Sequence, residues 1–277
     1  EKEFKKVVGK YYSPFKVTKL LDEIDALILE NDLQFVEHSV SESISGETIE
    51  VKINIFEGNK QLVERINIKG NTITDESVVR AELMLDEGDP FSNIKVEKSI
   101  AKLKSRNLFG EVLEVVSEGS SKDLKIIDIS VEEKPTGEIS AGAGVGTEGG
   151  SFSFNISENN WLGKGKKVST FVNLNKTTFQ GGFTVTDPNY DFSGNSLSYG
   201  LTTTTNDKPE SGFKNKIYSS SVGVGFEQYR NIYISPGLTL SYDDLKVEST
   251  ASESLKKQAG EFTDLAGSYS ISLDKRD

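Results

Sequence analysis

The chain contains no cysteine and a single histidine among its 277 residues. The absence of thiols excludes disulfides, thiolate zinc sites and a cysteine nucleophile. Any catalytic triad or histidine-bound metal would have to use His38, and the sequence offers no companion site for it. We interpret His38 as a partly exposed strand residue, and we expect no enzymatic activity, cofactor or metal.

Long apolar runs and positive charge are also scarce. The sequence has no apolar run of about 18 residues, and its mean hydropathy is -0.40, which excludes a helical membrane protein. A transmembrane β-barrel is not excluded, because its strands distribute apolar residues in alternation. The net charge of -11 argues against a nucleic-acid partner. Residues 1–4 carry no signal-peptide features.

The second half of the chain alternates apolar and polar residues from Glu138 to the C-terminal residue. The alternation comes in bursts of about ten residues, the length of a strand that crosses a bilayer, separated by Asn, Asp, Gly and Pro. The pattern predicts strands at residues 138–147, 151–158, 166–176, 178–187, 195–205, 215–227, 231–243 and 262–274. We therefore expect an antiparallel transmembrane β-barrel.

Each predicted strand has an apolar face and a face of mostly Ser, Gly, Asn and Thr. We expect the apolar face to contact lipid and the polar face to line a hydrated lumen. The predicted outward rows are Ile139, Ala141, Ala143 and Val145; Phe152, Phe154 and Ile156; Leu197, Tyr199 and Leu201; and Leu238, Leu240 and Tyr242. The acidic pairs Glu132-Glu133 and Asp243-Asp244 are interpreted as solvated faces or turns.

The first half contains an internal repeat. Pro14-Phe15 and Pro90-Phe91 each begin an amphipathic helix, and each helix leads into an aromatic-led strand and then an alternating strand. The second copy also has a strand over residues 65–69 and a helix capped at residues 74–75 that runs through Leu85. The unit is β-α-α-β-β, and we expect the first copy to be truncated at its N-terminus.

Seven short segments carry a resemblance to a known family: Ile66–Asn71, Leu103–Phe109, Glu133–Gly137, Gly142–Glu148, Asn159–Gly165, Thr186–Tyr190 and Leu273–Asp277. The first three resemble a POTRA domain and its joint with a barrel. The other four resemble strands and turns in the first half of the barrel of BamA-type outer-membrane assembly factors. The family's later Arg-Gly-Phe-type loop motif would lie beyond Asp277.

The resemblance implies α+β POTRA units followed by about eight strands of a larger barrel. The domains expected from it are a truncated POTRA unit at residues 1–62, a complete POTRA unit at 63–136 and the N-terminal half of the barrel at 137–277. The barrel would lie in the outer membrane of a Gram-negative bacterium, with the POTRA units in the periplasm.

The resemblance also implies a function, namely the assembly and insertion of β-barrel proteins into the outer membrane. The implied partners are unfolded outer-membrane protein precursors, lipoprotein subunits of the BAM complex and outer-membrane lipid. Arg80 and Glu87 match the family's docking surface for such subunits. Trp161, Leu162 and Gly163 match a turn at the periplasmic interface, where tryptophan is common.

The first barrel strand is the candidate functional element. Its residues are Ile139, Ser140, Ala141, Gly142, Ala143, Gly144, Val145 and Gly146. Glycine at alternate positions weakens strand packing and loosens register. In the family this strand is a lateral-gate edge that templates an incoming client strand. The alternative is a tightly curved seam that needs small residues. The G-x-G-x-x-G spelling at residues 144–149 precedes a strand rather than a helix, so it does not indicate a dinucleotide site.

Other functions stay open at this stage. Edges of the POTRA strands could accept client strands, or the POTRA units could be passive spacers. A related POTRA-barrel translocation pore, of the two-partner secretion type or an autotransporter helper, would have the same domain order. A periplasmic scaffolding protein with a soluble β-sandwich would instead pack the apolar rows into a common core.

Overall fold

The computed structural model describes residues 4–31, 33, 35–146, 149–229 and 231–274. The chain divides into two compact units. The N-terminal unit comprises Glu1–Gly70, Leu83–Arg106 and Glu111–Glu132, and the barrel unit comprises Asn71–Glu82, Asn107–Gly110 and Glu133–Asp277. The predicted strand end at Thr147, the motif end at Glu148 and the terminal residues 275–277 lie outside the described residues.

The N-terminal unit begins with helices α1 (Phe4–Val7) and α2 (Pro14–Glu30), followed by a hairpin of β1 (Val36–Ser45) and β2 (Thr48–Glu57). Pro14 lies at the start of α2, where its missing N–H has no helical partner to lose. One face of α2 is buried, at the helical spacing that the sequence predicted. Its buried residues are Val17, Leu20, Ile24 and Ile28.

A three-stranded sheet follows, with the order β3 (Leu62–Lys69), β5 (Leu124–Glu133) and β4 (Phe109–Glu118). The outer strand β3 pairs in parallel with the central strand β5. Two helices and β4 lie between them in the sequence, which gives the long connection that parallel neighbours need. Helix α4 (Asn93–Ser105) is capped by Ser92, whose Oγ accepts a hydrogen bond from the backbone N–H of Lys95.

The core of the N-terminal unit joins both copies of the repeat. Ile24 and Ile28 of α2 form a buried cluster with Ile94 of α4. A second group of fully buried side chains lies between α4 and the sheet, and its members are Val63, Ile66, Val96, Ile100, Leu103, Ile127 and Ile129. The amphipathic face predicted for the second helix is therefore confirmed.

Helix α3 is shorter than predicted. It spans Glu76–Arg80 and does not continue to Leu85. The carbonyl of Ala81 accepts a hydrogen bond from Asn189 Nδ2 at 3.1 Å, so the chain leaves the helix with this group satisfied from outside. Leu85 is buried, at 4% exposure, but reaches the core from an irregular segment.

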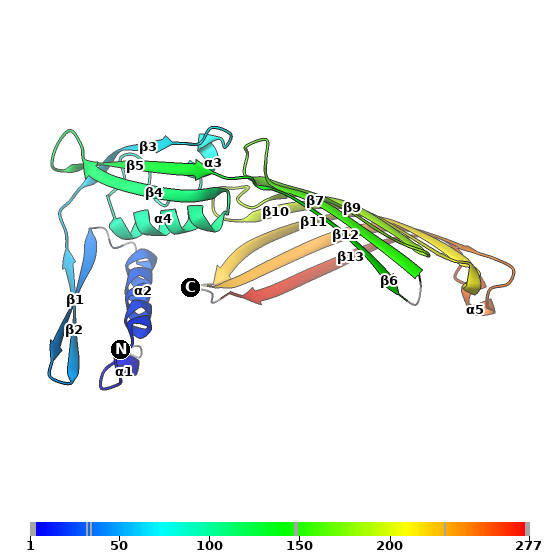
Figure 1. Cartoon of the computed structure of the whole chain (residues 1–277), viewed down its shortest axis with the longest axis horizontal. Helices are drawn as coiled ribbons and strands as arrows, with labels where there is room; N and C mark the ends of the chain where they lie inside the picture. Colours follow the sequence, from blue (N-terminus) through cyan, green and yellow to red (C-terminus); the bar gives the residue numbers. More distant parts are fainter. Residues whose placement is uncertain (1–3, 32, 34, 147–148, 230, 275–277) are drawn as a thin grey trace. The chain divides into compact units, whose positions relative to one another are not determined.

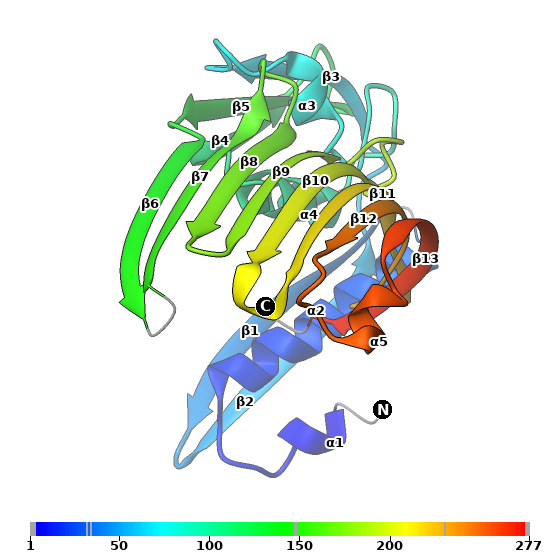
Figure 2. The same ribbon diagram turned by 90° about the vertical axis from the view of Figure 1, so that its right-hand side faces the viewer.

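The barrel unit contains eight consecutive antiparallel strands, as predicted. Their bounds are β6 (Gly137–Gly146), β7 (Gly149–Trp161), β8 (Lys166–Asn175), β9 (Thr178–Asp187), β10 (Ser196–Lys208), β11 (Phe213–Tyr229), β12 (Ile232–Val247) and β13 (Gly260–Leu273). The strands lie side by side in one curved sheet that ends at β6 and at β13 (Figures 1 and 2). Short helices η1 (Pro209–Ser211) and α5 (Glu253–Lys256) lie in two of the connections.

Several strands extend further than the sequence indicated. Pairs such as Lys208↔Phe213 and Leu245↔Gly260 carry the ladder into residues expected to be loops. Asp243 and Asp244 consequently lie within β12 and not in a turn. Polar residues near strand ends concealed the continuation, because backbone pairing does not depend on side-chain polarity.

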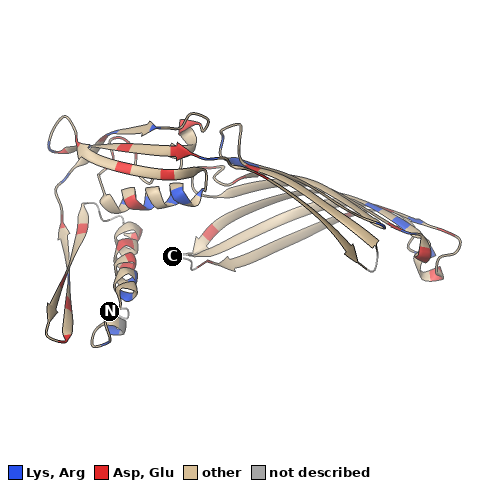
Figure 3. Ribbon diagram, viewed as in Figure 1, with Lys and Arg blue, Asp and Glu red and all other residues tan. Residues whose placement is uncertain are grey.

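Register places the predicted apolar rows on one face. Directly opposed residues of antiparallel strands share a face, and the pairs Ala143↔Phe152, Tyr199↔Val222 and Val222↔Leu238 connect the rows across the sheet. The middle of every strand is free of charge, and charged residues gather toward the strand ends (Figure 3). An uncharged band with one apolar face is what a membrane-spanning sheet requires.

The sheet has no core of its own among the described residues. None of the buried apolar side chains lies in a strand of this sheet, and Ala251 is in the connection between β12 and β13. This favours a barrel over a soluble sandwich, whose apolar rows would be buried against a second sheet. As for helices, none within the described ranges is both long and apolar enough to cross a membrane.

Candidate functional site

All eight candidate residues of the first barrel strand lie in β6, which is the terminal strand of the sheet. It pairs with β7 from Gly137↔Glu158 to Gly146↔Gly149. Among the described strands, none pairs with its other edge. The structure therefore brings these residues together at an open sheet edge.

The direction of the backbone groups follows from one hydrogen bond at the base of the strand. The carbonyl of Thr136 accepts from the N–H of Asn159 at 3.3 Å. Because bonded and non-bonded pairs alternate along an antiparallel ladder, even-numbered residues of β6 bond to β7. Odd-numbered residues direct their N–H and C=O groups to the open edge. Their side chains form the apolar row from Ile139 to Val145.

The three alternate glycines of β6 differ in how much room a side chain would have at their positions. A Cβ at Gly142 would lie 2.8 Å from Ser153 Oγ, and one at Gly144 would lie 3.1 Å from Ser151 Oγ. A Cβ at Gly146 would meet nothing within 4 Å. A larger residue at Gly142 or Gly144 would thus have to displace a serine hydroxyl, whereas at Gly146 the effect of glycine is a looser backbone.

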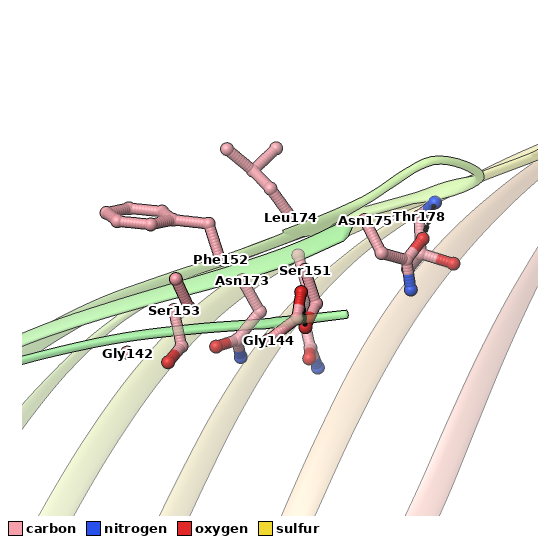
Figure 4. Close-up of a pocket in the computed structure, with 11 residues that line it drawn as sticks. Gly142, Gly144, Ser151, Phe152, Ser153, Asn173, Leu174, Asn175 and Thr178 are labelled. Atoms are coloured by element: carbon pink, nitrogen blue, oxygen red, sulfur yellow. Dashed lines mark hydrogen bonds between the residues drawn. The ribbon is translucent and has the colours of Figure 1, made fainter. Parts of the chain in front are cut away.

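A shallow hollow of about 460 Å³ lies beside these glycines, over strands β6 to β9. Ser151, Ser153 and Asn173 point to the side of the sheet that carries Gly142, while Phe152 and Leu174 point to the opposite side (Figure 4). The polar wall next to β6 consists of hydroxyl and amide groups and has no charge.

The base of β6 is held by a carboxylate that the sequence did not identify. Glu133, at the end of β5, accepts hydrogen bonds from the backbone N–H groups of Thr72 at 3.0 Å, Ile73 at 2.9 Å and Thr74 at 2.6 Å. Thr72 Oγ1 donates a fourth at 2.5 Å. Partial burial raises the pKa of Glu133, but these hydrogen bonds outweigh it and lower the pKa to about 2.

The interpretation of Glu132-Glu133 as a solvated pair is therefore wrong for Glu133, although Glu132 is exposed. A signal was present in the sequence. Ile127, Ile129 and Val131 alternate as buried residues of β5, and Glu133 continues that parity. A carboxylate on the buried side of a strand needs hydrogen-bond donors, and loop 72–74 supplies them.

The same loop contacts the turn between β7 and β8. Asn160 Nδ2 donates to Thr74 Oγ1 at 2.9 Å, and Asp75 N–H donates to the carbonyl of Gly163 at 2.8 Å. Asn160 is 9% exposed, and its Oδ1 also accepts from Gly165 N–H. The turn is thus fixed by its side chain as well as by its backbone.

The turn residues named from the sequence have two different environments. Trp161 is 48% exposed and Leu162 is 75% exposed, which fits the expected interfacial position. Gly163 instead packs against the loop, and a Cβ there would lie 2.1 Å from the carbonyl oxygen of Ile73. Its positive φ of 72° also favours glycine.

A second turn, between β9 and β10, contacts the segment that bears α3. Asn189 Nδ2 donates to the carbonyl of Ala81 at 3.1 Å and to Glu82 Oε1 at 3.4 Å. Asn189 Oδ1 accepts from Gly194 N–H, which fixes the side chain within its own turn. Two turns of the sheet therefore hold residues 71–82 within the barrel unit.

The docking candidates Arg80 and Glu87 belong to different units. Arg80 Nε donates to Glu76 Oε1 at 2.7 Å, one turn earlier in α3. Glu87 Oε1 accepts from the backbone N–H of Ile66 at 3.0 Å. Each side chain thus has a local structural role, and a joint docking role stays a prediction.

His38 is a partly exposed residue of strand β1, as expected. Its Nε2 lies 2.6 Å from Asp25 Oδ1, and the pair links β1 to α2. The part of the chain that the structure describes contains no cluster of three or more His, Asp or Glu side chains that could hold a metal.

Comparison with known families assigns both halves. Residues 61–134 match the POTRA model, described as a surface antigen variable number repeat, and residues 160–277 match the Omp85 superfamily domain. BamA of Neorickettsia risticii is 28% identical over 236 residues, covering 83% of this chain and 31% of that protein. BamA of Neisseria meningitidis is 30% identical over 195 residues, which cover 69% of this chain and 24% of that protein. The chain thus spans less than a third of these relatives.

Solved structures share the fold. BamA from Haemophilus ducreyi lacking POTRA domains 1-3 superposes with a TM-score of 0.63 at 20% identity, over 95% of this chain and 53% of that one. CdiB from Escherichia coli superposes with a TM-score of 0.56 at 13% identity, over 94% of this chain and 49% of that one. The chain therefore joins a POTRA domain to strands of an Omp85 barrel.

Within this class the chain is of the BamA type, as its curated relatives are. The expected location, with the barrel in the outer membrane and the POTRA part in the periplasm, agrees with these relatives. They are named outer membrane protein assembly factors.

Proposed function

We propose that this protein assembles β-barrel proteins in the bacterial outer membrane, without enzymatic chemistry or a cofactor. The observation that carries the proposal is the similarity to proteins named outer membrane protein assembly factor BamA, in a chain whose sheet begins at the glycine-alternating strand β6. Unfolded outer-membrane precursors are the proposed clients. Lipoprotein subunits of the assembly complex and outer-membrane lipid are the other proposed partners.

The mechanism follows from the cost of unpaired backbone groups. Each N–H or C=O group without a partner in the bilayer costs several kcal/mol. The odd-numbered residues of β6 present such groups in a row, and an extended client segment satisfies them by adding a strand. Recognition through the backbone demands little of the client sequence. Closure of the client barrel then releases free energy, so no nucleotide is needed.

The POTRA part receives clients and subunits in this proposal. Arg80 and Glu87 are the proposed docking residues for a lipoprotein subunit. Both have local partners, so docking of a subunit would compete with these contacts. The matched test compares Arg80→Ala with Glu76→Ala, which removes the same intrahelical pair. A docking role predicts loss of subunit co-purification with Arg80→Ala alone.

A translocation pore is the second candidate. The likeness to CdiB shows that the fold also occurs outside proteins named BamA, so the fold does not separate the two functions. The curated relatives favour assembly, because their names state it.

The direct test uses Ala143 in the full-length protein. Its N–H faces the open edge, so Ala143→Pro removes a templating donor while leaving the even-numbered bonds to β7 in place. Ala143→Val keeps the donor and the apolar side chain. We expect Ala143→Pro to lose client assembly and Ala143→Val to retain it at equal membrane levels. Equal assembly by both variants would remove β6 from the mechanism.

A further inference from the structure

Three turns join strands at the end of the sheet where β6 begins, namely β7–β8, β9–β10 and β11–β12. Each contains a residue other than glycine with a positive φ: Leu162 at 53°, Phe192 at 62° and Asn231 at 65°. Asparagine tolerates this left-handed conformation, whereas the conformation strains a bulky side chain. The third turn therefore has the residue type that a turn in water favours, and the first two turns do not.

The two strained apolar side chains are also exposed. Leu162 is 75% exposed and Phe192 is 72% exposed. A third large apolar side chain, that of Ile73, is 71% exposed, and the carbonyl oxygen of Ile73 lies close against Gly163, the neighbour of Leu162. Leaving this apolar surface in water is unfavourable. We call Ile73, Leu162 and Phe192 the apolar rim.

Hydrogen bonds within the barrel unit fix the backbone that carries the apolar rim. The N–H of Asp75 donates to the carbonyl of Gly163 at 2.8 Å, which joins loop 72–74 to the β7–β8 turn. Asn189 Nδ2 donates to the carbonyl of Ala81 at 3.1 Å, which joins the β9–β10 turn to the same segment of the barrel unit. These bonds hold the three positions in place and leave the rim side chains uncovered.

The apolar rim continues the lipid-facing surface of the sheet. Even-numbered residues of β8 belong to the apolar face, because Leu174 pairs with Phe152. Lys166 therefore lies on that face opposite Trp161, and its Nζ lies 3.0 Å from Asp187 Oδ2 at the end of β9. Tryptophan, and lysine that extends its amine toward headgroups, are typical of the border of a bilayer. The turn that follows Trp161 directly therefore starts at the depth of the lipid headgroups.

We propose that the apolar rim inserts into the headgroup region of the periplasmic leaflet and binds lipid there. Burial of the three side chains in lipid offsets their exposure and the strain at the two turns. Ile73 lies in the segment that matches the POTRA model, so the contact with lipid extends from the sheet into that segment. The inference needs only that the sheet spans the membrane, and it does not depend on the proposed assembly function.

The test places a nitroxide spin label at one position at a time in the full-length protein, purified alone in lipid nanodiscs and free of other cysteines. The labelled variants are Ile73→Cys, Leu162→Cys, Phe192→Cys and, as the matched control in the third turn, Asn231→Cys. Electron paramagnetic resonance measures collision with oxygen, which concentrates in lipid, and with a water-soluble nickel chelate. We expect the oxygen-to-nickel accessibility ratio at the rim to exceed that at position 231 by at least about twofold.

A second measurement uses the sign of a stability change. Leu162→Asn and Phe192→Asn suit the positive φ and remove apolar surface, so in a turn surrounded by water both would raise the denaturant midpoint of barrel unfolding in vesicles. Insertion into lipid predicts a lower midpoint for both variants. Asn231→Leu adds the backbone strain in the third turn and should lower the midpoint, which shows that the measurement detects such strain.

Two results would overturn the inference directly: accessibility ratios at the rim equal to that at position 231, or a higher midpoint for either asparagine variant. Low accessibility of the rim labels to both reagents would mean that protein covers these side chains, and it would overturn the inference as well.

Discussion

The two units of this chain place their apolar side chains in opposite ways. In the N-terminal unit Leu103 and Ile127 are each 1% exposed, behind a helix and a sheet. In the barrel unit Leu201 is 58% exposed and Leu240 is 52% exposed, although both lie in well-paired strands. The hydrophobic effect folds the first unit in water, whereas the second needs an apolar solvent to cover its rows.

The largest expected effect is on folding in water, when the two parts of the chain are produced as separate pieces. Residues 61–134 should fold in water, because that segment contains its own helix-on-sheet core. Residues 137–277 should not, because the apolar rows would meet water and the open edges would pair between chains. Circular dichroism of each piece without detergent tests this. A cooperative thermal transition of the second piece would contradict its assignment as a membrane-spanning sheet.

A cavity in the N-terminal core should have the next largest effect. Leu103→Ala should lower the free energy of unfolding by about 2–5 kcal/mol, because the side chain is fully enclosed. Urea denaturation in water measures the change. Leu113→Ala is the matched control, since Leu113 is 53% exposed on β4, and its cost should stay below about 1 kcal/mol. Equal costs would mean that α4 does not enclose this core.

Placing an arginine on each face of the sheet should change the free energy of unfolding by different amounts, and this difference should be smaller than the two effects above. Leu240→Arg puts a guanidinium on the apolar face and should cost about 2–4 kcal/mol near the bilayer midplane. Thr239→Arg, one residue away, places the same group on the polar face and should be tolerated. Unfolding in lipid vesicles by denaturant compares them. A larger cost for Thr239→Arg would reverse the assignment of the faces.

Period-two alternation predicted every strand of the sheet, because one face must be apolar in lipid and strand side chains alternate. It predicted the row from Ile139 to Val145 for the same reason. Residues that matter through distant contacts were not predictable in this way. Gly163 must be glycine because of Ile73, and nothing local in either segment shows that they meet.

Helix α3 shows the other limit of sequence patterns. Apolar residues at positions 83 and 85 suggested a longer helix, yet a contact from Asn189 satisfies the carbonyl of Ala81 and the helix ends at Arg80. Tertiary hydrogen bonds overrode local propensity there. Glu133 is an intermediate case, because its parity along β5 indicated the buried side but not the partner loop.

The smallest expected effect is the response to acid of the hydrogen bonds between Glu133 and loop 72–74. The pKa of Glu133 is lowered from 4.5 to about 2, so its ionised form stabilises the folded state. A group with a depressed folded pKa contributes fully above its unfolded value and loses that contribution as the pH falls toward the folded value. The contacts of loop 72–74 should therefore weaken between pH 4.5 and pH 2.

Trp161 can report this change, because it is the only tryptophan of the chain and lies in the turn that contacts the loop. We expect its fluorescence in lipid to shift across that acidic window in the unmodified protein. Glu133→Gln cannot titrate there and should lack this component. Identical acid profiles would show that Glu133 does not carry the contact between the loop and the turn.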